Sequence, residues 1–458
     1  MVLSEWDAPG RRLHDLLTRS RVSRRALPLG ALALAARAAP AGYDRFGGDR
    51  RIRSRATGLF RTERIGGRWM LISPEGHGYV ALGSNHIGKY MADPAQSGPL
   101  LERFRGDRKM AEQALIRAIA SLGLNAGEAY DPLLGGLRGR LPRIENVDLP
   151  GGVKFRYDIF DWEFQRALHQ SVKQQCSAFA GDPWVIGAAA VNEPVWDWRR
   201  VNFYRQLPPL AAGRIRYHDW LEKKHPGIDS LNRAWGTSFR SFGELRTLDK
   251  LPLIEGRAPH EHGADDEFLG LAADELHARL KAAVNAGAPW HLFLGERFVL
   301  RFPPDAVLRA VGNHVDVFCT QSLIHPPQRP PEWQIFQPER YRYEHGVTGK
   351  PMIIVDWATP FSLDTTYSHE RGVIKDERAA TADAAAFVAA AFAEPFLVGL
   401  FQCQLIGRHG NDRLFPDGRM KRTYLRDDAT PWPYRTAQMA KANRAALRRV
   451  YDSAAAAR

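Results

Sequence analysis

Cysteine is scarce in this sequence of 458 residues, with Cys176, Cys319 and Cys403 widely separated. Three scattered cysteines give neither a disulfide framework nor a CxxC zinc pair, and no HExxH motif is present. The sequence also has no Walker-type phosphate loop and no Gly-x-Ser-x-Gly elbow. It therefore predicts no metal centre and no organic cofactor, and we interpret the three thiols as small buried packing groups.

Long hydrophobic runs are also missing. No apolar stretch approaches the ~18–20 residues that span a bilayer. The hydrophobic content of 44% and the mean hydropathy of −0.37 are typical of a soluble globular protein with a large core. Stable membrane insertion is therefore not expected.

The net charge of +13 is unevenly distributed. Residues 1–55 hold twelve arginines, no lysine and five acidic residues, a net charge of +7 that leaves +6 for the other 403 residues. The body of the chain has no run of basic residues interleaved with aromatics. Nucleic acid is therefore not an expected partner.

The N-terminal segment has the parts of an export signal. An arginine pair, Arg24-Arg25, precedes the mostly apolar stretch Leu27–Ala36, and small-x-small cleavage patterns follow at 36–38 and 39–41. The pair resembles a twin-arginine signal. Residues 1–42 are thus interpreted as an export signal that directs the protein to the periplasm or the medium, or else as a disordered arginine-rich arm.

Eight candidate strands alternate with helical patterns, which is the signature of an α/β fold with a parallel (β/α)8 barrel, a TIM barrel. The predicted strands are Tyr79–Asn85, Leu122–Glu128, Leu141–Leu149, Trp184–Glu193, His291–Glu296, Val315–Gln321, Met352–Trp357 and Phe396–Gln404. The predicted helices include Lys109–Leu122, Phe164–Phe179, Glu267–Ala286 and Thr381–Ala393.

The barrel is expected to span residues 76–450, after a β-rich segment at 43–75 and before a tail at 451–458. Gly66-Gly67 is typical of a hairpin turn in the β-rich segment. About 95 residues separate the fourth and fifth strands. This long insertion, with helices expected at Tyr217–His225 and Ile228–Trp235, should lie at the mouth of the barrel.

Asn192-Glu193-Pro194 ends the apolar strand 184–191, and catalytic groups of parallel barrels stand at such strand ends. A carboxylate that emerges there between apolar walls has its proton affinity raised by desolvation and can act as an acid near neutral pH. Asn192 beside it can hydrogen-bond a sugar hydroxyl. A surface salt bridge is the alternative reading of Glu193.

Several segments in the same order resemble the β-agarase-like and β-galactosidase-like families of clan A, the retaining glycoside hydrolases with (β/α)8 barrels. The resemblance covers about residues 58–450. Besides Asn192-Glu193-Pro194, it rests on GRWMLISPEGH at 67–77, ALGSNH at 81–86, YDIFD at 157–161, NRAWGTSF at 232–239, WHLFLGERF at 290–298 and VDVF at 315–318.

The resemblance implies that Glu193 is the acid/base and that a second carboxylate, the nucleophile, ends the seventh strand. The family has Glu there, whereas this chain has Asp356, whose oxygens stand roughly 1–1.5 Å further back on a fixed backbone. Three explanations remain open. Asp356 attacks directly, or it activates a water in an inverting enzyme, or the chain has lost hydrolysis and kept sugar binding. An ion pair of Asp356 with an arginine is a further alternative.

Two other strand ends bear on the site. Glu296 is expected to point toward the same mouth and can replace the missing Glu, although a salt bridge to Arg297 explains it as well. At the sixth strand end the resembled clan often has a Tyr that orients the nucleophile. This chain has Gln321, which can donate a hydrogen bond to Asp356 but supplies no phenol.

Sugar binding requires flat apolar rings and polar side chains that can hydrogen-bond hydroxyl groups, near the same strand ends. Aromatic side chains stack on the C–H faces of sugars, while amides, imidazoles and carboxylates bind hydroxyls. Besides those already named, the candidate substrate-binding residues are Asn85, His86, Glu128, Trp196, Trp198, Trp357 and Gln402. Core packing is the alternative role for each tryptophan.

The sequence thus predicts an exported glycoside hydrolase that cleaves a poly- or oligosaccharide related to agar or other galactans. Glu193 is its acid/base and Asp356 its nucleophile, and carbohydrate is the expected partner. A barrel that binds carbohydrate without cleaving it is the second hypothesis. A third is a cytoplasmic transglycosylating or sugar-processing enzyme with a disordered N-terminal arm.

Overall fold

A computed structural model of the chain describes residues 41–127, 135–152, 156–255, 263–298, 303–322, 336–363, 375–407 and 420–457. Residues 1–40 of the predicted export signal and the candidate Glu128 lie outside these residues.

The described chain begins with a small antiparallel sheet. Its order is β1-β4-β3-β2, formed by β1 (Asp49–Arg53), β2 (Arg61–Ile65), β3 (Arg68–Ile72) and β4 (His77–Tyr79). Gly66 and Gly67 join β2 to β3 with φ values of 55° and 80°, which glycine adopts without steric cost. The predicted β-rich segment and its hairpin turn are confirmed, and the segment extends to Tyr79.

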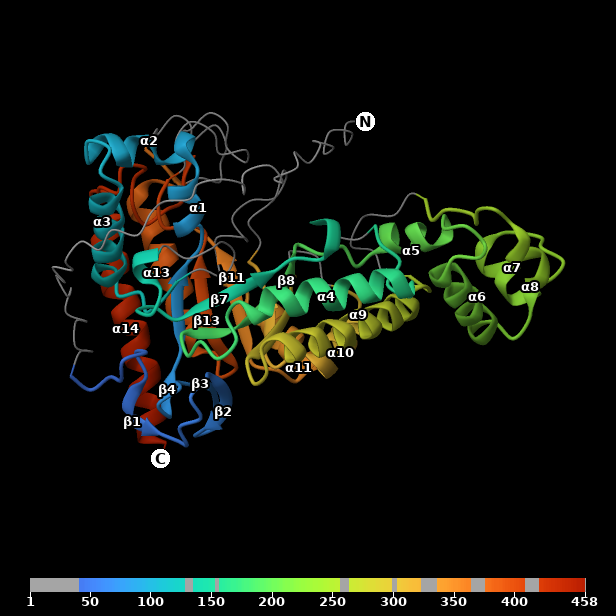
Figure 1. The fold of residues 1–458 in the computed structure, drawn as a ribbon, viewed down its shortest axis with the longest axis horizontal. Helices are drawn as coiled ribbons and strands as arrows, with labels where there is room; N and C mark the ends of the chain where they lie inside the picture. The colour runs from blue at the N-terminus through green and yellow to red at the C-terminus, as the bar shows by residue number, and fades with distance from the viewer. Residues whose placement is uncertain are drawn as a thin grey trace, which may run out of the picture. The chain divides into compact units, whose positions relative to one another are not determined.

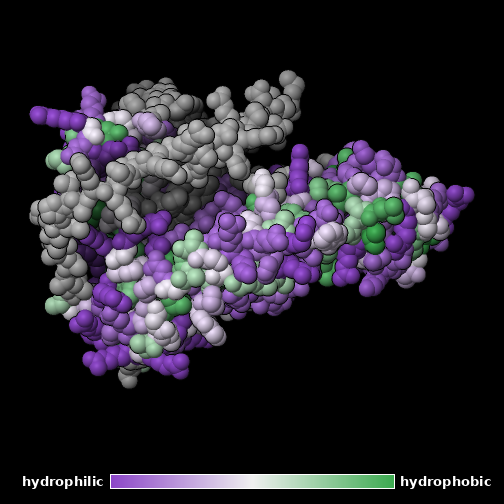
Figure 2. Space-filling view, viewed as in Figure 1, coloured by the Kyte–Doolittle hydropathy of each residue, from purple (hydrophilic) through white to green (hydrophobic). Residues whose placement is uncertain are grey.

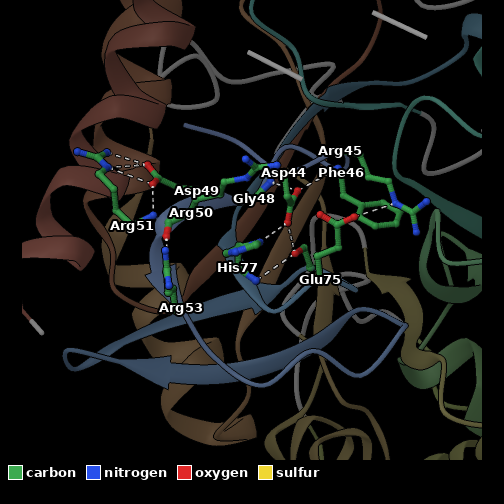
Figure 3. Close-up of polar contacts among 11 residues, drawn as sticks. Asp44, Arg45, Phe46, Gly48, Asp49, Arg50, Arg51, Arg53, Glu75 and His77 are labelled. Carbon is green, nitrogen blue, oxygen red and sulfur yellow. Dashed lines mark hydrogen bonds and ion pairs between the residues drawn. The ribbon is translucent and has the colours of Figure 1, made fainter. Parts of the chain in front are cut away.

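Asp44 holds this sheet to the loop before it (Figure 3). Its Oδ1 accepts hydrogen bonds from the backbone N–H groups of Phe46 (2.9 Å) and Gly48 (2.7 Å). Its Oδ2 accepts from the Ser73 hydroxyl and contacts Nδ1 of His77 at 2.8 Å. Asp44 is fully buried. Because all of its acceptor capacity is used by protein donors, its role is structural.

Replacing Asp44 with Ala is expected to destabilise the protein by about 2–4 kcal/mol, because the buried donors around it lose a charged acceptor. Chemical denaturation measures this loss. Glu75→Ala is the matched control, since it breaks only the exposed 3.0 Å ion pair with Arg45 and should cost less than about 1 kcal/mol. Equal costs for the two variants would contradict the role of Asp44.

Eight parallel strands close the barrel in the order β10-β11-β13-β5-β6-β7-β8-β9 (Figure 1). They are β5 (Ala81–Ser84), β6 (Ala126–Gly127), β7 (Arg143–Val147), β8 (Val185–Asn192), β9 (Leu292–Phe298), β10 (Phe318–Thr320), β11 (Met352–Trp357) and β13 (Leu397–Gln402). Each observed strand lies within or overlaps one predicted strand. The predicted (β/α)8 barrel is confirmed.

Small and branched apolar side chains fill the inside of the barrel, as expected for strands buried on both faces. The packed interior includes Ala81, Ala126, Ile144, Ile186, Ala189, Leu292, Leu294, Val317, Cys319, Ile353, Val355, Val398 and Phe401. The other faces of the strands pack against helices in a second apolar cluster.

Helices cover the barrel and form the insertion. Those outside the insertion are α1 (Ile87–Ala92), α2 (Pro94–Arg103), α3 (Arg108–Ser121), α4 (Trp162–Ser177), α9 (Asp266–Gly287), α10 (Asp305–His314), α11 (Pro338–Thr348), α13 (Glu377–Ala393) and α14 (Arg435–Ala456). Aspartates cap three of them: Asp107, Asp161 and Asp376 each accept a hydrogen bond from the backbone N–H three residues on. No helix of the described ranges has the length and apolarity needed to cross a membrane.

The insertion leaves the barrel at the C-terminal end of β8. It contains α5 (Trp198–Arg205), α6 (Ala212–Lys224), α7 (Ile228–Trp235) and α8 (Phe242–Thr247), which lie beyond the ends of α4 and α9 in Figure 1. Its two predicted helices are α6 and α7. The face drawn in Figure 2 is mostly hydrophilic, with some hydrophobic side chains over these helices.

The predicted tail at 451–458 is not a separate segment. α14 continues to Ala456, and its last turns are packed, with Tyr451 and Ala454 buried. The Tyr451 ring meets the Tyr43 ring edge-on at 5.9 Å, so the C-terminal helix is fixed to the start of the described chain. Alanine-rich sequence gave no apolar pattern strong enough to reveal this packing.

Candidate active site

A one-residue bulge in β9 decides which of its side chains face the mouth of the barrel. Ala188 pairs with Phe293 and Ala189 with Gly295, so Leu294 is the extra residue. Gly295 has φ of 69° and makes the bulge possible. Because side chains alternate along a strand, the bulge reverses the faces of every residue after it. Glu296 consequently faces the helices, together with Phe298, and Arg297 faces the barrel.

Glu193 follows β8 directly and is half-buried. Its backbone N–H donates to the carbonyl of Arg297 at 3.1 Å, which ties it to β9. Both Glu193 (φ 56°) and Val191 (φ 40°) have positive φ, a costly conformation for a residue with a β-carbon and especially for a β-branched one. Such strain collects at functional sites, where surrounding contacts enforce it.

Asp356 lies at the end of β11 and is 8% exposed. The Asn85 amide, at the end of β5, donates to its Oδ1 at 2.5 Å and also to the carbonyl of Val355. Burial raises the pKa of Asp356, against the opposing effects of His86, Asn85 and Arg297, and the negative charge of Glu193 raises it further. The two predicted catalytic carboxylates therefore lie close enough to interact across the same end of the barrel.

Gln321 and Asn192 form a second contact between strand ends. The Gln321 amide donates to Oδ1 of Asn192 at 2.9 Å. The expected hydrogen bond from Gln321 to Asp356 is thus replaced, among the described contacts, by one that orients the Asn192 side chain. Asp356 is bound to this strand end through the backbone, where the N–H of Ser322 donates to its carbonyl at 2.8 Å.

Arg297 lies at the site, although the sequence alone predicts only an ion pair between it and Glu296. It is 1% exposed, donates from Nη2 to Oδ1 of Asn146 at 3.0 Å, and its charge lowers the pKa of Asp356. Gly295 is the sequence signal that could have revealed it, because glycine within a strand often marks a bulge.

Glu296 does not reach the mouth, and its predicted role in substrate binding is wrong. It is fully buried, and its Oε2 accepts a hydrogen bond from Nε1 of Trp196 at 2.6 Å and lies 3.5 Å from Nε2 of His277. The Arg200 guanidinium stacks over the Trp196 ring at 4.0 Å and donates to the carbonyl of Val195 at 2.8 Å. The contacts among Glu296, Trp196 and Arg200 fix the loop after Glu193. Trp196 is therefore buried between these side chains and does not stack on a sugar.

The protonated form of Glu296 suits this environment. Burial raises its pKa to about 7, although the Arg200 charge and the Trp196 hydrogen bond oppose the rise. Burial also lowers the pKa of His277 to about 4. The Nδ1 of His277 lies 2.8 Å from the carbonyl of Ala273, to which it donates as a neutral ring, so its Nε2 is the acceptor that faces Glu296.

Glu296→Gln is expected to remove a pH dependence of stability. The pKa of Glu296 is about 4.5 in the unfolded chain and about 7 in the folded one. The free energy of unfolding of the wild type should therefore fall by roughly 2–3 kcal/mol as the pH rises from 4.5 to 7. Glu296→Gln should not show this fall, because glutamine mimics the protonated acid. Denaturation of both proteins at pH 5 and pH 8 measures the difference. Parallel pH profiles would contradict this state of Glu296.

The remaining candidates divide between the mouth and the core. His86 is half-buried beside Asp356, and Trp198 is half-buried at the start of α5. Trp357 is fully buried and stacks on Phe387 of α13 at 4.8 Å, so its predicted contact with sugar is wrong. Gln402 is also fully buried and donates to the carbonyl of Arg422 at 2.7 Å, which makes it a structural residue.

Two groups of side chains in the described ranges have atoms spaced closely enough to hold a metal ion. In one, Asp44 and His77 are hydrogen-bonded to each other and Glu75 forms an ion pair with Arg45 (Figure 3). The side chains of this group therefore already have partners within the protein. The other consists of His86, Asp356 and Cys403, at the mouth of the barrel.

No family model matches the chain. In sequence it is similar to β-agarase B of Vibrio sp. (strain JT0107), with 21% identity in an alignment 349 residues long. The alignment covers 57% of this chain and 36% of that protein. The chain therefore spans little more than a third of the length of this curated relative.

Solved structures with the same fold include an agarase (TM-score 0.70, 18% identity) and an exo-β-agarase (TM-score 0.71, 17% identity). Each comparison covers 90% of this chain and 68% of the other. The predicted resemblance to β-agarase-like barrels is thus confirmed: the chain is similar in sequence to a β-agarase and has the barrel fold of two agarase structures.

Proposed function

We propose that this chain is a glycoside hydrolase that cleaves an agarose-like polysaccharide. The observation that carries the proposal is the pair of carboxylates, Glu193 and Asp356, at the C-terminal ends of β8 and β11, close enough for their charges to interact. Hydrolysis of a glycosidic bond requires two such groups. The similarity to β-agarase B of Vibrio sp. supports the choice of substrate.

In the proposed mechanism Asp356 attacks the anomeric carbon and Glu193 protonates the leaving oxygen. His86, Arg297 and the Asn85 hydrogen bond favour the ionised form of Asp356, as a nucleophile requires. Asn85 also fixes the direction of the carboxylate. Water then hydrolyses the glycosyl-enzyme with Glu193 as the base, so the anomeric configuration is retained.

Asn192 is the proposed contact for a sugar hydroxyl. Gln321 holds its Oδ1, which directs the amide NH₂ of Asn192 for donation to the substrate. The half-buried His86 and Trp198 are the other proposed substrate contacts near this end of the barrel.

Release of reducing ends from a panel of polysaccharides tests the function. The panel contains agarose, other galactans and a uronate-containing polymer. We expect turnover of agarose or its oligosaccharides and little turnover of the rest. Binding of oligosaccharide without turnover of any member would favour the carbohydrate-binding barrel that the short Asp356 first suggested.

We also propose that the protein is exported. The support is the arginine pair, the apolar stretch Leu27–Ala36 and the alanine-rich cleavage patterns after it. N-terminal sequencing of the protein recovered from the periplasm or medium should find a start near residue 42. Intact N-termini confined to the cytoplasm would contradict export.

A further inference from the structure

Three strand ends bring a nitrogen, an oxygen and a sulfur ligand together beside the proposed nucleophile. His86 follows β5, Asp356 belongs to β11 and Cys403 follows β13. One ligand atom from each lies within 4.8 Å of the other two. Asp356 and Cys403 are buried, whereas His86 is half-buried and partly exposed to solvent.

These donors match the coordination preference of zinc. Zn²⁺ binds imidazole nitrogen and carboxylate oxygen at about 2.0–2.2 Å and thiolate sulfur at about 2.3 Å, usually with four ligands. Three protein ligands with one open position describe an accessible zinc site. Tetrahedral ligands at these bond lengths stand roughly 3.3–3.7 Å apart, so side-chain movements of about 1 Å would close the group around an ion.

The surroundings fix the Asp356 side chain and the Cys403 backbone before any ion arrives. Asp356 is held by the Asn85 amide at 2.5 Å, a hydrogen bond of the kind that orients carboxylate ligands. Cys403 is held through its backbone N–H, which donates to the carbonyl of Trp357 at 2.9 Å. Such preorganisation lowers the cost of binding.

We propose that His86, Asp356 and Cys403 form a site for Zn²⁺ and that the bound ion inhibits the enzyme. The Cys403 thiol loses its proton to solvent as its sulfur binds the ion. The carboxylate of Asp356, which attacks the sugar in the proposed mechanism, is then coordinated to zinc. Substrate turnover therefore stops until the ion is removed. The inhibitory part rests on the proposed function, whereas the binding part does not.

The sequence contains no zinc motif that would have predicted this site. His86 lies 270 residues before Asp356, and Cys403 lies 47 residues after it. The three ligands meet because β5, β13 and β11 are neighbours in the closed barrel. The Asp44 group is a poorer zinc site, because it has no thiol and the carboxylate of Asp44 already accepts hydrogen bonds from protein donors.

Isothermal titration of the full chain with ZnCl₂ tests the site directly. We expect one ion per chain for the wild type. The expected loss of affinity is at least roughly tenfold in Cys403→Ser and in His86→Gln, since each removes a ligand. Cys176→Ser, a matched change in α4, and His77→Gln, in the Asp44 group, should bind zinc as the wild type does.

Hydrolysis assays with added ZnCl₂ and then EDTA give the second readout. Zinc should stop wild-type turnover, EDTA should restore it, and the remaining activity of Cys403→Ser should resist zinc. If the chain hydrolyses nothing, the titration still decides the binding part. Absence of zinc binding, or binding that Cys403→Ser and His86→Gln leave unchanged, would overturn the site. Loss of zinc binding in His77→Gln would also overturn the site, because it would show that zinc binds the Asp44 group instead.

Discussion

Asp356→Asn is expected to lower kcat on agarose by a factor on the order of 10⁴ or more, because the amide removes the negative charge that attacks the anomeric carbon. The variant should still fold, since the Asn side chain keeps the oxygen that accepts the 2.5 Å hydrogen bond from Asn85. Reducing-end assays on purified proteins of equal thermal stability measure the loss.

Asp182→Asn is the matched control for this change. It makes the same substitution at the opposite end of β8, where Asp182 pairs with Arg143 at 2.9 Å. Its kcat should remain within about twofold of the wild type, because the change lies at the far end of the barrel from the proposed site and keeps an oxygen that accepts from Arg143. Asp356→Glu restores a carboxylate and should keep measurable activity if the site accommodates the longer side chain. An Asp356→Asn protein with wild-type turnover would exclude Asp356 as the nucleophile.

Glu193→Gln is expected to lower kcat on agarose by roughly 10²–10⁴-fold, the usual contribution of a general acid or base. The loss in the first step should shrink for an aryl glycoside with a good leaving group, because such a group departs without protonation. A burst of released phenol followed by slow turnover would then report an accumulated glycosyl-enzyme. Stopped-flow absorbance measures both phases.

Glu75→Gln is the control for the Glu193 change, because Glu75 lies in the N-terminal sheet region, where it pairs with the exposed Arg45. It should leave kcat and the burst unchanged. Equal losses on agarose and on the aryl glycoside would show that Glu193 does not protonate the leaving group, and would make it a structural residue at the end of β8.

The barrel strands could be predicted because strands buried on both faces appear as short apolar runs bounded by turns. Val185–Asn192 and Met352–Trp357 are such runs; Glu193 follows the first directly, and Asp356 is the last residue but one of the second. Position at a strand end was therefore enough to bring Glu193 and Asp356 together.

The directions of side chains near the strand ends could not be predicted in the same way. Simple alternation places Glu296 in the barrel, but the bulge at Leu294-Gly295 turns it toward His277 and turns Arg297 inward. A bulge depends on one glycine and on the pairing of neighbouring strands, which the local pattern does not contain.

Tertiary packing also decided the roles of the aromatic residues. Trp357 is adjacent to Asp356 in sequence, yet it points to the opposite face of β11 and stacks on α13. The sequence alone indicates a packing role for Cys403, because only closure of the barrel brings this residue to His86 and Asp356.

The anomeric configuration of the first product is the most direct test of the two-carboxylate mechanism. Proton NMR during early hydrolysis of an agaro-oligosaccharide should show the new reducing end in the configuration of the cleaved bond, before mutarotation mixes the anomers. This result requires direct attack by Asp356 and a separation of about 5–5.5 Å between the two carboxyl groups during the reaction. A first product of inverted configuration would contradict the account and make Asp356 the base that activates water.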